Sequence, residues 1–223
     1  MTTAARSYRW LFWTLAIVGL AVDQTSKYGL FRELYNEGNG GRIVVIPGAF
    51  YLDVPQSSSA LVPQDWLRPL RAWSGERMPT VNKGALFGLG QDMNVWFAAV
   101  SIFAAVVVLY WQSRPQSGRD PFLCVALGLI LAGTLGNLYD RVVFAGVRDF
   151  LHWNKWFDWY VFNIADVCLV AGASMLVLEA LFAKPKSQPT EGETDYANAA
   201  PIAAGVSGGG AAVKGVAVTT TAE

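Results

Sequence analysis

Between Asp120 and Asp140 the chain reads PFLCVALGLILAGTLGNLY (Pro121–Tyr139), a run without a charged residue. A second uncharged run extends from Met93 to Ser113. An α-helix needs about 20 mostly apolar residues to cross the hydrocarbon core of a membrane. Both runs are therefore predicted to be transmembrane helices.

Two further apolar runs carry charged residues. The first extends from Trp10 to Phe31 and contains Asp23 and Lys27, and the last extends from Tyr160 to Ala183 and contains Asp166 near its start. Charges inside a membrane helix are costly, so they indicate a functional or paired site rather than a reason to reject the helix. The fold class we predict is an all-α membrane protein with four transmembrane helices.

The N-terminal run has an alternative interpretation as a cleaved signal peptide. Arg6 and Arg9 would supply its basic start, and Gly19-Leu20-Ala21 would supply a small-residue cleavage site. That site lies inside the apolar run rather than after it, and residues 24–31 can continue the helix. We therefore favour a retained membrane helix.

Composition supports a membrane protein and excludes several functions. Residues are 53% hydrophobic and only 15% charged, against about 25% charged in an ordinary soluble domain. The 17 basic and 17 acidic residues cancel, which argues against binding of nucleic acid through its phosphates. Two cysteines and one histidine are too few for a zinc site, an iron-sulfur site or a disulfide framework.

Lysine and arginine predict the orientation, because they are enriched in cytoplasmic loops. One side of the four helices carries six of these residues: Arg6, Arg9, Arg114, Arg119, Lys184 and Lys186. The connection between the last two helices carries three: Arg141, Arg148 and Lys155. We therefore predict cytoplasmic termini, with Asp140 and Asp166 at the outer surface and Asp23 in the outer half of its helix.

Three segments outside the helices have distinct compositions. Residues 42–54 are rich in Ile, Val, Phe and Tyr, interrupted by Pro47-Gly48, and predict a short β-hairpin. Residues 55–80 form an irregular insertion whose Trp66, Leu67, Leu70 and Trp73 suggest a flap on the substrate side, lying in the membrane interface. Residues 184–223, rich in Gly, Ala and Thr, are predicted to be a disordered cytoplasmic tail.

Polar residues at the ends of the last two helices are spaced to act together. Asn137 and Asp140 are three residues apart, as are Asn163 and Asp166, and this spacing puts each pair on one helix face. Asp149 stands between them in sequence. Antiparallel helices would thus gather carboxylates at one membrane depth.

Simpler interpretations remain open for two of these carboxylates. Asp23 and Lys27 have the i,i+4 spacing of a local ion pair, and Asp140 could pair with Arg141 or be solvated.

Close carboxyls resist simultaneous ionisation, so that one keeps a proton while the other deprotonates water, as in aspartic proteases. The competing functions are a proton-coupled carrier, which would distribute carboxylates through the bilayer, and a structural subunit with purely structural polar pairs.

The order of these segments resembles the lipoprotein signal peptidase family, also called signal peptidase II. The matching segments are Val22–Lys27, Asn82–Gly88, Gly136–Arg141, Val147–Phe150 and Phe162–Asp166. The resemblance covers roughly residues 10–183, and its specificity comes from the five segments occurring in family order.

The resemblance implies an aspartyl endopeptidase in the bacterial cytoplasmic (inner) membrane. Its substrate would be a diacylglyceryl-modified prolipoprotein, cut just before the modified cysteine, and the family has a small extracytoplasmic β-cradle. Asp149 and Asp166 correspond to the catalytic pair. Asn137, Asp140, Arg141 and Asn163 correspond to the surrounding polar shell, and Asp23 and Asn82 to further site or structural residues. The family uses no metal or organic cofactor.

Three features depart from the family pattern. Arg148 replaces a usually apolar residue beside Asp149, and we expect its charge to favour ionisation of that neighbour. Leu86 replaces a usually smaller residue, and the 55–80 insertion lengthens a short connection. None removes an expected aspartate or asparagine, so the departures concern substrate fit rather than activity.

Overall fold

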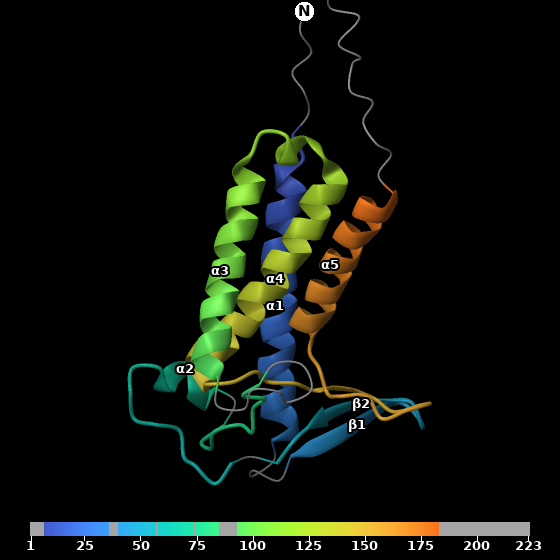
Figure 1. Ribbon diagram of the computed structural model, residues 1–223. Coiled ribbons are helices and arrows are strands. Elements are labelled where there is room, and N and C mark those ends of the chain that lie inside the picture. Colours follow the sequence, from blue (N-terminus) through green and yellow to red (C-terminus); the bar gives the residue numbers. More distant parts are fainter. Residues whose placement is uncertain (1–6, 36–39, 57, 74, 85–92, 183–223) are drawn as a thin grey trace, which may run out of the picture. The chain divides into compact units, whose positions relative to one another are not determined.

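The computed structural model describes residues 7–182, apart from 36–39, 57, 74 and 85–92. Its long helices are α1 (Arg9–Leu34), α3 (Asn94–Ser113), α4 (Pro121–Phe144) and α5 (Ile164–Phe182). They lie side by side, and α4 contacts each of the other three (Figure 1). Leu86 and the predicted tail lie outside the described residues.

Within the described part of the chain, α3, α4 and α5 are long and apolar enough to cross a membrane. Side chains exposed on these helices are largely apolar, including Phe103, Val170 and Leu181. This confirms a membrane protein with at least three apolar helices. α1 is longer, but it is not among the helices that are apolar enough to meet this criterion.

The helix ends differ from the predicted boundaries for local reasons. α4 continues past the expected end at Tyr139 to Phe144, where Ala145 adopts a left-handed conformation (φ 58°) that ends the helix. α5 begins at Ile164 rather than residue 160, because the side chain of Asn163 caps its first turn.

Small residues let α1 and α4 approach closely. A Cβ atom on Gly128 would lie 2.8 Å from the carbonyl oxygen of Phe12, and one on Gly19 would lie 2.7 Å from the Ala132 Cβ. The contacts advance in the same direction along both helices, so α1 and α4 are parallel. α1 also continues without interruption through the Gly19–Ala21 site of the signal-peptide alternative.

A three-stranded antiparallel sheet follows the C-terminal end of α1 in Figure 1. β1 (Gly41–Ile46) and β2 (Phe50–Val54) form the predicted hairpin, with Gly48 at φ 71° in the turn. The third strand, β3 (Leu151–Trp153), pairs with β2 and was not predicted. Through β3 the sheet is joined directly to the chain that carries Asp149.

Two buried apolar clusters hold the fold together. One joins α1, α3 and α4 and includes Phe12, Ala16, Ala105, Val108, Cys124, Leu127 and Leu131. The other joins the end of α1 to the sheet and contains Phe31, Tyr35, Val54 and Phe150. Asp23 and Lys27 lie between these clusters along α1 and are fully buried. A polar layer therefore separates two apolar ones.

The insertion contains a short helix, α2 (Arg68–Ala72). The Tyr28 hydroxyl of α1 donates a 3.0 Å hydrogen bond to the Leu70 carbonyl, and Arg71 Nε donates to the Val143 carbonyl at 2.6 Å. These two bonds attach the middle of the insertion to α1 and to the end of α4.

Candidate active site

The connection between α4 and α5 holds Asp149 between two fixed backbone segments. On one side, Val147 and Asn82 exchange two backbone hydrogen bonds of 2.8 Å. On the other side, the Phe150 N–H donates to the Phe162 carbonyl at 2.9 Å, and the Phe150 side chain is buried. The backbone therefore limits how far the Asp149 side chain can move.

Gly146 allows the chain near Asn82 to come close to this connection. A Cβ atom on Gly146 would lie 2.5 Å from the Val81 Cγ2 and 3.0 Å from the Asn82 carbonyl oxygen. The close approach brings the Asn82 side chain to Asp149, and Asn82 Nδ2 donates to Asp149 Oδ2 at 3.2 Å. The predicted site residue Asn82 thus contacts the predicted catalytic carboxyl.

Asp166 is held by the N-terminus of α5. The Asn163 side-chain oxygen accepts a hydrogen bond from the Asp166 backbone N–H at 3.0 Å, and Asp166 Oδ2 accepts one from the Asn163 backbone N–H at 3.2 Å. This is a capping box, in which each side chain satisfies a backbone donor of the first helical turn. The helix dipole also favours a negative charge at this position.

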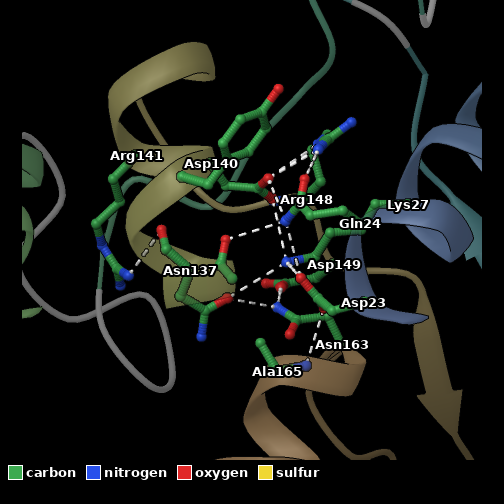
Figure 2. Close-up of polar contacts among 12 residues, drawn as sticks. Asp23, Gln24, Lys27, Asn137, Asp140, Arg141, Arg148, Asp149, Asn163 and Ala165 are labelled. Carbon is green, nitrogen blue, oxygen red and sulfur yellow. Dashed lines mark hydrogen bonds and ion pairs between the residues drawn. The ribbon is translucent and has the colours of Figure 1, made fainter. Parts of the chain in front are cut away.

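Two asparagine side chains connect the two carboxyls. Asn163 Nδ2 donates to Asp149 Oδ1 at 2.7 Å and to Asn137 Oδ1 at 3.2 Å. Asn137 Nδ2 in turn donates to Asp166 Oδ1 at 2.7 Å. Figure 2 shows Asn137 and Asn163 meeting from different segments of the chain. Asp149 and Asp166 therefore belong to one continuous hydrogen-bonded chain.

Both carboxyls line a cavity of about 640 Å³ between α3, α4 and α5. Its polar lining includes Asp53, Asn82, Asn137, Arg141, Asp149 and Asp166, whereas Phe97, Val100, Leu169, Val170, Trp159 and Phe162 supply apolar walls. The carboxyls thus face a space that is open to water and to an apolar ligand.

The environment of Asp149 favours a bound proton. Burial raises the pKa of this carboxyl to about 7, and the nearby charge of Asp166 acts in the same direction. Hydrogen bonds from Asn163 and Asn82 oppose the increase in pKa. Asp149 can therefore hold a proton near neutral pH, as one member of an aspartic pair must.

Arg148, which we expected to favour ionisation of Asp149, lies on the other side of the segment. Neighbouring side chains in an extended segment point to opposite sides, and Arg148 turns away from the cavity. Its Nη2 lies 2.8 Å from Asp140 Oδ1. The pKa of Asp149 is nevertheless raised, because burial and the charge of Asp166 outweigh the contributions that lower it.

Behind the cavity lies a buried cluster of four charges, which we call the ion cluster: Asp23, Lys27, Asp140 and Arg148. All four side chains are fully buried. Lys27 Nζ lies 2.9 Å from Asp23 Oδ2 and 3.2 Å from Asp140 Oδ2. Two anions and two cations balance, as buried charges require.

The predicted polar residues thus form two groups rather than one. Asp149 and Asp166 face the cavity, while Asp23 and Asp140 lie in the ion cluster. The local Asp23–Lys27 pair is confirmed, but Asp23 Oδ1 also accepts from the Ala165 backbone N–H at 2.9 Å, which ties α1 to α5.

The suggested pairing of Asp140 with Arg141 is wrong. Asp140 pairs with Lys27 and Arg148 instead. The guanidinium of Arg141 lies 5.6 Å from the centre of the Phe97 ring, and Arg141 lines the cavity.

Sequence reasoning did not assign Gln24, Lys27 and Arg148 to the site. Gln24 Nε2 donates to Asp23 Oδ2 at 2.9 Å, and Gln24 Oε1 accepts from Arg148 Nη2 at 2.9 Å. Lys27 Nζ donates to Asn137 Oδ1 at 3.4 Å, which joins the ion cluster to the asparagine pair. Polar residues inside an apolar helix were the available signal for Gln24 and Lys27.

The insertion contributes only its ends to the described cavity lining, through Pro55 and Thr80. Leu70 and Trp73 instead line a separate groove with Tyr28 and Tyr139. The substrate-side flap hypothesis is therefore not supported for the middle of the insertion.

Metal-binding side chains are not gathered in the part of the chain that the structure describes. There, no group of three His, Cys, Asp or Glu side chains is arranged to hold a metal ion. Cys124 and Cys168 are free thiols, both buried.

Comparison with solved structures supports this fold. The chain is similar to two bacterial membrane enzymes whose structures were solved by the in meso method. The TM-scores are 0.61 and 0.58 at 21% and 24% sequence identity, with 85% and 82% of this chain and all of each solved chain covered. At these identities the likeness shows a shared fold.

Sequence comparison shows the family. Residues 76–182 match the family described as signal peptidase (SPase) II. A lipoprotein signal peptidase of Rhodopirellula baltica is 35% identical over 76% of this chain and 70% of its own length. Those of Symbiobacterium thermophilum and Pseudomonas syringae pv. tomato are 32% and 36% identical over 77% and 81% of this chain and 95% and 90% of their lengths. The chain therefore belongs to the signal peptidase II family of lipoprotein signal peptidases.

Proposed function

We propose that Asp149 and Asp166 are the catalytic pair with which this protein removes signal peptides from bacterial prolipoproteins. The observation that carries the proposal is the hydrogen-bonded chain from Asp149 through Asn163 and Asn137 to Asp166, at the polar end of an apolar cavity. Family membership supplies the reaction, removal of a signal peptide. The geometry supports an aspartyl mechanism for it.

In the active form the pair holds one proton, and the raised pKa of Asp149 favours this residue as its carrier. The ionised Asp166 removes a proton from water while the water oxygen attacks the scissile carbonyl carbon. Asp149 donates its proton to the carbonyl oxygen, which gives a neutral tetrahedral intermediate. As the carbon–nitrogen bond breaks, Asp166 gives the proton it took from water to the departing amine nitrogen. Asp149 takes a proton from one hydroxyl of the intermediate, which becomes the carboxylic acid. The pair returns to its singly protonated form.

The supporting residues have separable roles in this proposal. Asn82, Asn137 and Asn163 donate hydrogen bonds that orient the two carboxyls. Asp23 and Asp140 act from the ion cluster, which fixes the relative positions of the helices and the Asp149 segment. Arg141 lines the cavity and is available to contact the substrate.

The cavity has the chemistry that a lipidated membrane substrate requires. Apolar side chains of α3 and α5, including Phe97, Val100 and Val170, form its walls. They would accept the apolar signal peptide or the acyl chains of a diacylglyceryl-modified cysteine. The polar end would then hold the peptide bond just before that cysteine.

The protein is a multi-pass membrane protein, and we infer that α1 is its fourth transmembrane helix. α1 runs parallel to α4, and its internal charges at Asp23 and Lys27 are buried against neighbours rather than exposed to lipid. Its exposed side chains include Trp13, Ile17 and Val22. The loop charges favour cytoplasmic termini and an active site near the outer surface of the inner membrane.

The test is cleavage of a diacylglyceryl-modified prolipoprotein by the purified enzyme. Folded Asp149→Asn and Asp166→Asn variants should be inactive, and the double variant should lose little more than either single one, because paired residues act as a unit. Asp158→Asn, which changes an exposed carboxylate, is the matched control and should keep activity. Substantial cleavage by either folded catalytic variant would reject the assignment.

A further inference from the structure

Arg148 is the residue immediately before Asp149 and is fully buried. Its contacts lie on the side of the segment opposite the cavity, in the ion cluster. Because Arg148 and Asp149 are consecutive in an extended segment, fixing one side chain restricts the other. The position of the guanidinium is therefore coupled to the position of the neighbouring carboxyl.

Asp140 binds both the backbone and the side chain of Arg148. Its Oδ2 accepts from the Arg148 backbone N–H at 2.9 Å, while its Oδ1 accepts from Nη2 at 2.8 Å and from Nε at 3.3 Å. Arg148 Nη2 also donates to Gln24 Oε1 at 2.9 Å. Figure 2 shows this approach of Arg148 to Asp140 and Gln24. Such a planar, multiply bonded guanidinium has little freedom to rotate.

Two aromatic rings stack against the guanidinium. Its carbon lies 4.0 Å from the centre of the Phe144 ring and 4.3 Å from that of Tyr28. The Tyr28 hydroxyl bonds the Tyr139 hydroxyl at 2.6 Å and the Leu70 carbonyl in the insertion at 3.0 Å. The insertion therefore supports the Tyr28 ring of this stack.

We propose that Arg148 is a positioning residue that holds Asp149 in its catalytic place, and that helix α2 of the insertion supports it through Tyr28. This inference rests on the proposed catalytic role of Asp149. Arg148 acts through its attachment to Asp140 and through the aromatic stack, without touching the substrate. It also gives the insertion a role behind the site rather than over it.

The expected loss is in turnover rather than in substrate binding. Without the guanidinium, the Asp149 segment loses its attachment to Asp140, and the carboxyl shifts relative to Asn163 and Asn82. A displacement of about 1 Å at a reacting group can reduce the rate by about a hundredfold. Arg148 does not line the cavity in the described residues, so KM should change little.

The experiment compares kcat, KM and the pH profile of folded Arg148→Met and Arg148→Lys enzymes on a diacylglyceryl-modified prolipoprotein. We expect Arg148→Met to lower kcat by about ten- to a hundredfold, with KM within about twofold. Its alkaline limb should move to higher pH, because Asp149 loses donors that oppose its raised pKa. Arg148→Lys should lose less, because it keeps the charge beside Asp140 but lacks the planar fork.

Arg77→Met is the matched control, because it removes an exposed cation of the same insertion outside α2, where Arg77 Nη1 donates to the Ser59 carbonyl at 3.2 Å. It should keep the kcat and pH profile of the wild-type enzyme. If Arg148→Met does not fold, Phe144→Leu removes one ring of the stack and leaves the ion pair. We expect it to lower kcat severalfold in the same direction.

The results separate this inference from the proposed function. A folded Arg148→Met enzyme with wild-type kcat and pH profile, or only a smaller yield of normal enzyme, would overturn the positioning role. If Arg148→Met does not fold, unchanged turnover in both Arg148→Lys and Phe144→Leu would also overturn the positioning role. Turnover by a folded Asp149→Asn enzyme would instead reject the catalytic pair itself.

Discussion

Asn163 and Asp166 are joined by two reciprocal hydrogen bonds, of 3.0 Å from the Asp166 N–H to the Asn163 side chain and of 3.2 Å from the Asn163 N–H to the Asp166 carboxylate. Asn163 meanwhile donates its side-chain N–H groups to Asp149 and Asn137. One asparagine therefore ends the connection, starts helix α5 and orients both carboxyls. The side-chain nitrogen of Asn163 orients the catalytic site, and its side-chain oxygen caps the helix.

The two uses predict different results for two substitutions. Asn163→Ser keeps an oxygen that can cap the helix but loses the donors to Asp149 and Asn137, so kcat should fall about ten- to a hundredfold. The buried oxygens left without a donor should cost about 1–3 kcal/mol of stability. Asn163→Ala should lose the same activity and about 1 kcal/mol of additional stability, because it also removes the cap. Steady-state kinetics and thermal unfolding of the purified enzymes measure both effects. Equal stability of the two variants would contradict the capping role.

The activity should have a bell-shaped dependence on pH, because only the singly protonated pair is active. The pKa of Asp149 is raised to about 7 by burial and by the charge of Asp166. Activity should therefore fall as the pH rises through about 7, where this carboxyl loses its proton, and again in acid, where both carboxyls are protonated. A kcat/KM profile on lipidated substrate measures both limbs. A rate that stays flat from pH 6 to pH 9 would contradict this assignment.

The same pKa predicts a pH-dependent cost in stability. The folded state keeps a proton on Asp149 up to about pH 7, whereas the unfolded state loses it near the ordinary value of 3.8. Stability therefore falls as the pH rises between these values, by about 1.4 kcal/mol for each pKa unit. Asp149→Asn does not titrate, so its stability relative to the wild type should increase by on the order of 4 kcal/mol between pH 4 and pH 8. Thermal unfolding at both pH values tests this, and an unchanged difference would refute it.

Much of the framework was predictable because its signals are local. Uncharged runs identified α3 and α4, and Pro47-Gly48 between apolar residues identified the hairpin. The i,i+3 spacing of Asn163 and Asp166 also indicated a shared helix face, and the capping box has the same spacing. These features depend on residues within one or two turns of each other.

The division of the carboxylates into two groups could not be predicted from local spacing. Asp140 finds its partner Arg148 only because the chain reverses after α4, at Ala145 and Gly146. Strand β3 has three residues, too few to show an alternating pattern, and it forms by pairing with β2. Both features depend on contacts between segments that are distant or reversed in direction.

The ion cluster offers a test of how buried charges stabilise this fold. Lys27 contacts both Asp23 and Asp140, so Lys27→Met leaves two buried anions with only Arg148 as counter-charge. Removing one partner of a buried ion pair costs about 3–5 kcal/mol. Lys27→Met should therefore yield poorly folded enzyme with a lower melting temperature.

Restoring charge balance should recover part of that loss. The double variant Asp23→Asn, Lys27→Met keeps the Asp140–Arg148 pair, and an asparagine at position 23 still offers an oxygen to the Ala165 N–H. It should thus melt at a higher temperature than Lys27→Met alone. The wild type, the two single variants at Asp23 and Lys27 and the double variant form a double-mutant cycle. The matched control is a second cycle on the exposed Arg68–Glu76 pair, with Arg68→Met and Glu76→Gln, and its coupling free energy should be about 0–1 kcal/mol. Additive effects at Asp23 and Lys27 would show that charge balance does not stabilise this cluster, because true partners in a buried network are coupled.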